Sequence, residues 1–544
     1  MPLPSQPLPP HRPKLRHRVP VRLRHHWKLV AASGAFVLVL GAGLGTETIR
    51  PYATTAEVAA TETVTEDIAG LKDLFDPAAA HDVELTFKDA AYEDMLEEYF
   101  KDGSKKYVEA DLTIDGTVIP GVGIRLKGNS TLMGLTWKGE SSNARGGRGS
   151  RGGRMPEGME PPEGFQPPGD GQMPEGFQLP EGFQGGGPPG GGPGGQQLKA
   201  EEPEDLPWLI SFDEFAEGRR YQGLSQLAVR PSLNGSTLLN EALALTLTGE
   251  SGEPTQEYAY GSFTVNGRSS APRLLIGHPD EAYAEDLGDG VLYKSLASSS
   301  FSYKGEDQTA YADDFKQINR KGTQDLQPVI DLVKWTEESS DTEFARGLAD
   351  RLDTASFARY LALQNLMVNF DDMSGPGRNY YLWYDLGAKK FKVVSWDLNY
   401  AFNGDAEAGA TDTLSMGGRG GGRPQGQQGS QNQQEQQPRQ GQEDGQGQQE
   451  RQGRPGGGMQ MGHTLKERFL ENAAFKEVYA EQYRLLYQDL LADGTAASAL
   501  DAIVASYRLN EGADTDRATS DAEALRTTLQ TRIKSLSTDA TVTG

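Results

Sequence analysis

The chain contains no cysteine among its 544 residues. This absence excludes disulfide bonds, catalysis by a thiolate, and zinc or iron–sulfur sites held by cysteine. Histidine is also scarce. Four of the 7 histidines lie within the first 26 residues, and the other three, His81, His278 and His463, are far apart. Their scatter argues against a histidine-based zinc site and against a Ser–His–Asp triad.

Positive charge is in short supply as well, because 53 Lys and Arg face 77 Asp and Glu, for a net charge of −24. An acidic body repels nucleic acid, whose binding depends on Lys and Arg that neutralise phosphates, so we expect no nucleic-acid partner. The charge is compatible with divalent cations or simply with solubility. Residues 1–28 are the exception, since they carry seven cations and no acid: Arg12, Lys14, Arg16, Arg18, Arg22, Arg24 and Lys28.

An uncharged apolar run, Leu29–Leu44, follows this basic arm. Its length is at the short edge of what crosses a bilayer. We predict a single-pass signal anchor over 29–46, with the body outside the cytoplasm because the cations precede the run. The alternative is a signal peptide cleaved near Ala53–Ala56, which would give a secreted protein. The anchor is favoured because these small residues lie well beyond the apolar run.

The rest of the chain is predicted to be one interrupted domain. Residues 47–80 read as a linker, 81–535 as the domain and 536–544 as a tail. Two tracts rich in Gly, Pro, Gln and Arg, 139–198 and 417–461, cannot pack a core and are predicted to be disordered insertions. We favour tolerated expansion of surface loops, which costs little closure entropy. The alternative is that the tracts act as interaction arms.

Within the domain, strand and helix patterns are mixed and partly segregated, which predicts an α+β fold. VELTFKD alternates as a strand does, DAAYEDMLEEYFKD is an amphipathic helix, and two strands flank a turn at Asp115-Gly116. A later helix is expected to have Asn234 or Ser236 as its N-cap. Further predictions are a strand ending at an Asn266-Gly267 turn, helices at Leu326–Trp335 and Asp353–Asn369, and a helical region over 464–535. The helix at Asp353–Asn369 is expected to have Asp353 or Thr354 as its cap.

The segment from Gln364 to Asn403 carries the clearest chemistry. Asp371 and Asp372 follow a helix, Asn379 opens the strand YYLWYD, and the strand FKVVSW leads back to Asp397. Because a hairpin brings the start of one strand beside the end of the next, Asn379 and Asp397 are expected to be neighbours. Carboxylate and amide oxygens suit magnesium, and phosphoryl transfer needs a metal and a carboxylate that orients the attacking hydroxyl. The alternative is that these residues only cap loops at a sheet edge.

Several motifs resemble the CotH (spore coat protein H) kinase family, atypical kinases distantly related to protein kinases. They are NFD, NYYLWYD and VVSWDLNYAF in this segment, RLKGNST at Arg125–Thr131, and GVLYK at Gly290–Lys294. The resemblance implies an atypical protein-kinase-like fold with a mixed sheet and a C-terminal helical part. It also implies an enzyme that uses ATP and magnesium to phosphorylate hydroxyls, often on secreted or cell-surface proteins. The expected partner is therefore an extracytoplasmic protein substrate.

The same resemblance implies roles for single residues. Asp371 matches the catalytic-loop acid, and Asn379 and Asp397 match the magnesium ligands. Lys127 or Lys294 would meet the nucleotide phosphates, with Glu241 as the ion-pair partner.

The sequence departs from the pattern in three places. Asn399 stands where the family often has a second acid, and no G-x-G-x-x-G loop precedes a lysine. GNST, which includes Asn129, could aim backbone N–H groups at a phosphate, or could be an ordinary turn or a glycosylation sequon. Asp371 and Asn379 are further apart than the protein-kinase pair, so Asp372 is the alternative catalytic base.

Two functions follow from this reading. The first is an extracytoplasmic, membrane-anchored kinase of CotH type. The second is a non-catalytic protein of the cell envelope or matrix that uses the same scaffold and its low-complexity arms for interaction.

Overall fold

The computed structural model describes residues 64–128, 130–132, 134–142, 198–231, 236–414 and 462–544. The predicted arm 1–28 and apolar segment 29–46 lie outside the described residues, as do all of 417–461 and most of 139–198. Asn129 and Asn234 also lie outside them. Within the described ranges, no helix is both long enough and apolar enough to cross a membrane.

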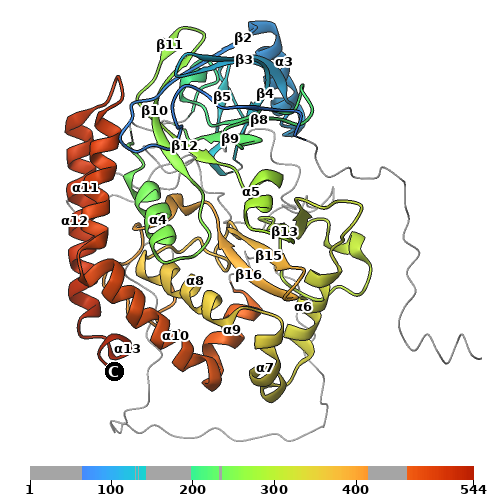
Figure 1. Cartoon of the computed structure of the whole chain (residues 1–544), viewed down its shortest axis with the longest axis vertical. Coiled ribbons are helices and arrows are strands. Elements are labelled where there is room, and N and C mark those ends of the chain that lie inside the picture. Colours follow the sequence, from blue (N-terminus) through green and yellow to red (C-terminus); the bar gives the residue numbers. More distant parts are fainter. Residues whose placement is uncertain (1–63, 129, 133, 143–197, 232–235, 415–461) are drawn as a thin grey trace, which may run out of the picture. The chain divides into compact units, whose positions relative to one another are not determined.

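A closed β-barrel forms the N-terminal part (Figure 1). Its strands follow the order β10-β12-β9-β7-β4-β3-β2, and β10 also pairs with β2, which closes the sheet. All neighbours are antiparallel except β10 and β2, which are parallel. The strands are β2 (Asp82–Phe87), β3 (Val108–Ile114), β4 (Thr117–Leu126), β7 (Trp208–Ser211), β9 (Gln226–Val229), β10 (Tyr258–Val265) and β12 (Arg273–Gly277), with β11 (Arg268–Ser269) extending β10.

The alternating pattern of the sequence explains the barrel's interior. In β2 every second side chain is buried, and β3 shows the same alternation up to the turn at Asp115-Gly116, which joins β3 to β4. Asp115 and Gly116 have φ values of 48° and 81°, the left-handed geometry that tight hairpins need. The predicted amphipathic helix is α3 (Asp89–Asp102), and Tyr92 on it packs against Trp208 inside the barrel core.

Part of the expected linker packs on the barrel. Strand β1 (Glu66–Ile68) runs parallel to β8 (Arg219–Tyr221), and the side chain of Leu74 is fully buried in the barrel core. Two further short strands, β5 (Thr136–Trp137) and β6 (Glu140–Ser141), form a separate hairpin.

A second, antiparallel sheet has the order β14-β13-β15-β16. Its strands are β13 (Gly290–Ser295), β14 (Phe315–Gln317), β15 (Tyr380–Asp385) and β16 (Lys390–Ser395). The predicted hairpin is confirmed, because β15 and β16 pair from Tyr380↔Ser395 to Asp385↔Lys390. Helix α8 (Thr354–Leu366) contacts β16, and its predicted cap is also confirmed: the Asp353 carboxylate accepts from the Ser356 N–H at 3.0 Å.

Of the other helices, α5 contacts β13 of this sheet, and α10 packs on α8. The C-terminal pair α11 and α12 runs alongside α4 (Figure 1). The helical region predicted for 464–535 is confirmed and includes a π-helical turn at Tyr487–Ala492. The helices are α4 (Leu239–Glu250), α5 (Glu281–Asp286), α6 (Gln327–Glu338), α7 (Asp341–Gly347), α9 (Thr464–Glu471), α10 (Ala473–Leu486), α11 (Thr495–Arg508), α12 (Thr515–Leu536) and α13 (Ala540–Thr543).

Two sequence predictions need correction. Helix α4 begins after Leu238, which has a φ of 52° and makes no side-chain cap, so Ser236 is not its N-cap. Helix α8 ends at Leu366 rather than at Asn369, because Val368 adopts a φ of 43° that breaks the helical path.

The α+β class is confirmed, but the sequence analysis expected one mixed sheet. The chain instead forms a closed barrel and a separate antiparallel sheet. Closure depends on the pairing of β2 with β10, whose residues are far apart in sequence, and local patterns carry no information about such a contact.

Candidate functional site

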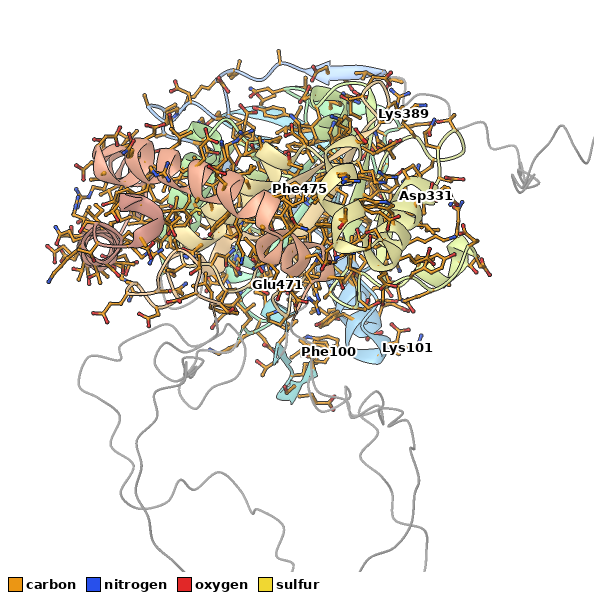
Figure 2. The ribbon with its side chains drawn as sticks, turned by 90° about the horizontal axis from the view of Figure 1, so that it is seen from below. Phe100, Lys101, Asp331, Lys389, Glu471 and Phe475 are labelled. Carbon is orange, nitrogen blue, oxygen red and sulfur yellow. The ribbon has the colours of Figure 1, made fainter. Side chains whose placement is uncertain are left out.

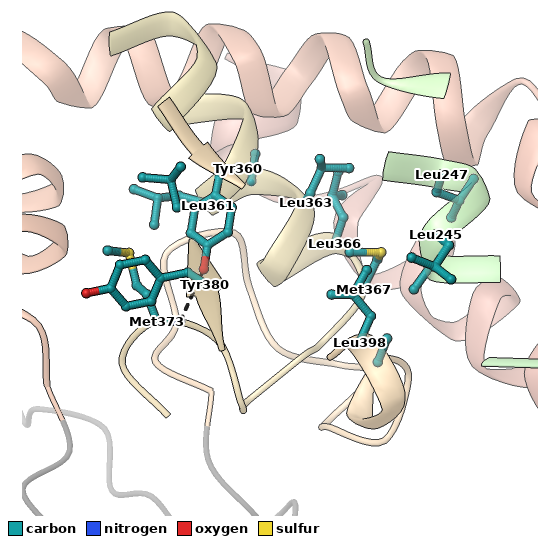
Figure 3. Packing of buried hydrophobic residues seen from close by; sticks show 14 of the residues in the cluster. Leu245, Leu247, Tyr360, Leu361, Leu363, Leu366, Met367, Met373, Tyr380 and Leu398 are labelled. Carbon is teal, nitrogen blue, oxygen red and sulfur yellow. Dashed lines mark hydrogen bonds between the residues drawn. The ribbon is translucent and has the colours of Figure 1, made fainter. Parts of the chain in front are cut away.

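Helix α8 fixes the loop that carries Asp371 and Asp372. Its buried Tyr360 accepts a hydrogen bond from the Met373 N–H at 3.2 Å, drawn as a dashed line in Figure 3. One turn further on, Gln364 accepts from the side-chain amide of Asn369 at 2.7 Å. Apolar side chains of α8, such as Leu363 and Leu366, lie beside Met367, where the loop begins, in the same buried cluster (Figure 3). The loop is therefore anchored to the core at both of these points.

Asp371 and Asn379 are bonded directly to each other. The Asn379 amide nitrogen donates to Oδ2 of Asp371 at 2.9 Å and to its backbone carbonyl at 3.2 Å, and the Gly377 N–H donates to Oδ1 at 2.6 Å. Because the amide nitrogen faces Asp371, the amide oxygen of Asn379 is the atom left to accept or to ligate. Burial raises the pKa of Asp371 to about 6, and the negative charges of Asp397 and Asp372 add to this rise.

Glycine makes this close approach feasible. A Cβ at Gly377 would lie 2.5 Å from the Asn379 amide nitrogen and 2.8 Å from Oδ2 of Asp371. A Cβ at Gly375 would lie 2.5 Å from the Asp371 Cα. Both positions therefore need glycine for the loop to fold back on Asp371.

Asp372 points to different partners. Its Oδ1 accepts from the N–H and the hydroxyl of Ser374 at 2.8 and 2.6 Å, and its Oδ2 forms an ion pair with Lys466 on α9. Burial would raise the pKa of Asp372, but Lys466 and Ser374 outweigh it and hold this pKa below its usual range. Since Asp372 is paired with a cation that lowers its pKa, whereas Asp371 accepts only from the neutral donors Gly377 and Asn379, the geometry favours Asp371 over Asp372 as a base.

A cavity of about 730 Å³ borders the loop on the Asp372 side. Its lining combines apolar side chains with carboxylates and hydroxyls from α8, α9, α10 and residues 410–414. Glu471, at the end of α9, lies on its rim and is labelled in Figure 2. The cavity gives a second molecule room to approach the loop.

Asp397 follows the hairpin and has a φ of 54°, so the chain turns sharply there. Its Oδ1 accepts from Nη2 of Arg230 at 2.6 Å, and the same Nη2 pairs with Glu241 on α4. Burial would raise the pKa of Asp397, but Arg230 and then Lys127 outweigh it and keep this pKa below its usual range.

This pairing corrects one prediction. Glu241 was expected to pair with Lys127 or Lys294, whereas its ion-pair partner is Arg230. The sequence analysis missed Arg230, which directly follows β9 and precedes a proline. The signal available was its position at the end of a strand, eleven residues before Glu241.

Lys127 and Lys294 converge on one aromatic ring. Their Nζ atoms lie 4.8 and 5.3 Å from the centre of the Trp396 indole, and neither forms an ion pair with any residue that the structure describes. Burial lowers the pKa of Lys127 to about 7, with Arg230 adding to the effect, and burial lowers the pKa of Lys294 to about 8. An anion beside these two lysines would relieve the cost of burying their ammonium groups.

The elements bring the predicted acid and amide positions together. The hairpin pairs Tyr380 with Ser395 at its open end. Asn379 and Trp396 lie directly beyond that pair, and Asp397 follows Trp396. The negative charge of Asp397 helps to raise the pKa of Asp371, and both carboxylates help to raise the pKa of Tyr400. No group of three acidic or histidine side chains among the described residues is arranged as a metal site.

A mixed set of oxygens nevertheless fits a hard cation. The set is the two carboxylates of Asp371 and Asp397 and the amide oxygen of Asn379, which are the donor types that magnesium takes while keeping several waters. The amide oxygen of Asn399, two residues beyond Asp397, is buried and has no hydrogen-bond partner in the described part of the chain. Asn129 belongs to the residues that the structure does not describe.

Comparison with known proteins gives one match. The family model described as "CotH kinase protein" matches residues 198–538, more than half of the chain. The match covers α4, the loop with Asp371 and the hairpin that leads to Asp397, whereas Lys127 lies before it. No curated protein matches the chain. The match confirms the resemblance inferred from the motifs: the chain belongs to the CotH kinase family.

Proposed function

We propose that the chain is an atypical kinase that transfers the γ-phosphate of ATP to a protein hydroxyl and requires magnesium. The observation that carries this proposal is the bonded pair of Asp371 and Asn379 beside Asp397, with the ammonium groups of Lys127 and Lys294 across the Trp396 ring. Membership of the CotH kinase family supports the same activity. The analogy to a kinase-like fold rests on the motifs and on this family.

Each side chain has a role that its environment supports. Asp371, held by Gly377 and Asn379, orients the acceptor hydroxyl and takes its proton. Asp397 and the amide oxygen of Asn379 would hold the magnesium ion, which neutralises phosphate charge when bound. Lys127 and Lys294 contact the phosphates. Asp372 keeps the loop in place through Lys466.

The acceptor is proposed to be a protein outside the cytoplasm. The basic arm and apolar segment of residues 1–46 support that location. The cavity beside the loop supports an acceptor that is larger than water, because its mixed lining suits a peptide segment.

The test is transfer of labelled γ-phosphate by the purified chain. We expect magnesium-dependent labelling of an added protein, which Asp397→Ala abolishes. Asp331→Ala is the matched control, because Asp331 is an exposed carboxylate on α6, away from the loop. Labelling that survives Asp397→Ala would refute the site.

A binding measurement separates the enzyme from the envelope scaffold. For the enzyme, ATP with magnesium should raise the melting temperature of the wild-type chain, because a ligand that binds only the folded state stabilises it. The scaffold predicts no change in melting temperature at any nucleotide concentration.

A further inference from the structure

We propose that Arg230 is a positioning residue whose guanidinium pairs with the Asp397 carboxylate until a divalent cation displaces it. This inference rests on the proposed function, since it concerns how the same site is loaded. In this exchange, the Arg230 guanidinium releases the Asp397 carboxylate when the cation arrives and stays paired with Glu241.

The contacts of Arg230 differ at its two ends. One nitrogen, Nη2, serves both carboxylates, at 2.6 Å from Asp397 and closer still to Glu241. The Glu241 side chain is 1% exposed, whereas the Asp397 side chain is 30% exposed. An entering cation can therefore reach Asp397 but not Glu241. The ion pair of Arg230 with Asp397 is therefore the one that a cation can replace, and the ion pair with Glu241 is not.

The ion pair between Arg230 and Glu241 also leaves some hydrogen-bonding atoms of both side chains unused. Nε of Arg230 and Oε2 of Glu241 are buried and have no hydrogen-bond partner among the described residues. A guanidinium and a carboxylate can form two parallel bonds, and this pair uses only part of that capacity. A second arrangement, in which Arg230 turns fully to Glu241, would use these free atoms and leave Asp397 open.

Only the side chain of Arg230 is free to change. Its N–H donates to the Leu274 carbonyl at 2.9 Å, and its own carbonyl accepts from Nε of Arg273 at 2.6 Å. These bonds tie the backbone of Arg230 to β12 in the barrel. The exchange is thus a rotation of one side chain about a fixed point.

Other charges face Asp397 and would remain after the exchange. Lys127 and Lys294 both act on the Asp397 carboxylate, although neither forms an ion pair with it in the described structure. They attract anions and repel a bare cation. We therefore expect the metal to bind weakly to the free protein and more tightly when nucleotide phosphates cover the two lysines.

The experiment measures metal binding without nucleotide. Manganese, a paramagnetic substitute for magnesium, is titrated into the full chain and the free ion is followed by electron paramagnetic resonance. Arg230→Met alone would leave Glu241 buried without a partner, so the main variant is Arg230→Met/Glu241→Met, which removes both charges at similar volume. We expect it to bind manganese about tenfold more tightly than the wild type, because the competing guanidinium is gone.

Two controls give the measurement its meaning. Arg125→Met removes a positive charge that acts on Lys294 but forms no ion pair with Asp397 in the described structure, and it should change the affinity less than about twofold, because its effect is screened. Arg230→Lys keeps a cation at the position and should bind manganese as weakly as the wild type. Melting temperatures of all variants show that each is folded.

The outcomes separate the two proposals. Equal affinity in the wild type and the double variant, with binding lost in Asp397→Ala, would overturn the exchange and leave the proposed metal site intact. Weaker binding in the double variant would also overturn it, because Arg230 would then support the ion. Absence of manganese binding in every chain, with or without ATP, would overturn both proposals.

Discussion

Buried arginines play different parts in and beside the barrel and at the candidate site. In the described part of the chain, the guanidinium groups of Arg219 on β8 and Arg273 in the barrel donate only to backbone carbonyls. At the candidate site, Arg230 instead bridges the carboxylates of Glu241 and Asp397. A carbonyl cannot leave its strand, whereas a carboxylate can exchange one cation for another. Burial alone therefore does not mark a functional charge; the kind of partner does.

The largest expected effect tests the barrel half of this comparison. Arg273→Met removes the donor to the carbonyls of Glu204, Leu206 and Arg230 and leaves three buried acceptors unpaired. We expect a loss of unfolding free energy on the order of 3–5 kcal/mol, measured by urea denaturation. Arg268→Met, an exposed arginine of the neighbouring strand, should cost less than about 1 kcal/mol. Equal losses in the two variants would contradict the structural role of Arg273.

The next effect tests the loop, where two adjacent carboxylates have different partners. Asp371→Asn keeps the shape and removes the proton acceptor. Its single amide oxygen can keep the contact with Asn379, but its NH2 then faces the Gly377 N–H. We expect turnover to fall by roughly 10²–10⁴-fold, with only a small fall in melting temperature. Turnover is measured by phosphate transfer under saturating ATP.

Asp372→Asn is the matched control for that variant. It breaks the ion pair with Lys466, so its main effect should be a lower melting temperature, while turnover falls less than in Asp371→Asn. The opposite ranking of turnover would make Asp372 the base and contradict the assignment of Asp371.

A smaller effect is expected from the glycine that lets the two side chains meet. Gly377→Ala would push Asn379 away from Asp371, because the new methyl group would sit 2.5 Å from the amide nitrogen. We expect turnover to fall about tenfold through misplacement of the pair. Gly387→Ala, in the turn of the hairpin, is the control and should leave turnover unchanged, because its nearest contact is an exposed carboxylate at 3.3 Å.

The sequence allowed the local geometry of the site to be predicted, but not which residues of the barrel strands contact it. The hairpin and the cap at Asp353 follow from patterns within a few residues, and both are confirmed. The ion-pair partner of Glu241 does not follow from local patterns, because Arg230 and Lys127 are equally plausible cations until the strands that carry them are placed. The pairing of β4 and of β9 with the same strand, β7, decides that placement. It is a contact between distant segments, which periodicity cannot reveal.

The smallest effect concerns a third kind of buried charge, a carboxyl that has no cation. Asp280 lies where the chain leaves β12, and its Oδ1 caps α5 by accepting from the Tyr283 N–H. Burial raises the pKa of Asp280 to about 7, although hydrogen bonds from Ser225 and Tyr283 oppose the rise. The folded chain therefore holds this proton more tightly than the unfolded chain, and the stability it contributes is present in acid and lost as the pH rises through about 7.

Asp280→Asn removes this titration while keeping an oxygen for the cap. At pH 8 the variant should melt a few degrees above the wild type, on the order of 1–3 kcal/mol, because it avoids a buried negative charge. At pH 3.8 and below, where the carboxyl is largely protonated in the unfolded chain as well as in the folded one, this advantage should disappear. Asp307→Asn, an exposed cap of a short helical turn, is the control and should not raise the melting temperature at pH 8. If the Asp280→Asn variant melts above the wild type by the same amount at both pH values, Asp280 is ionised throughout this range. A buried carboxylate at this position would then need no cation of the kind that Arg230 gives Asp397.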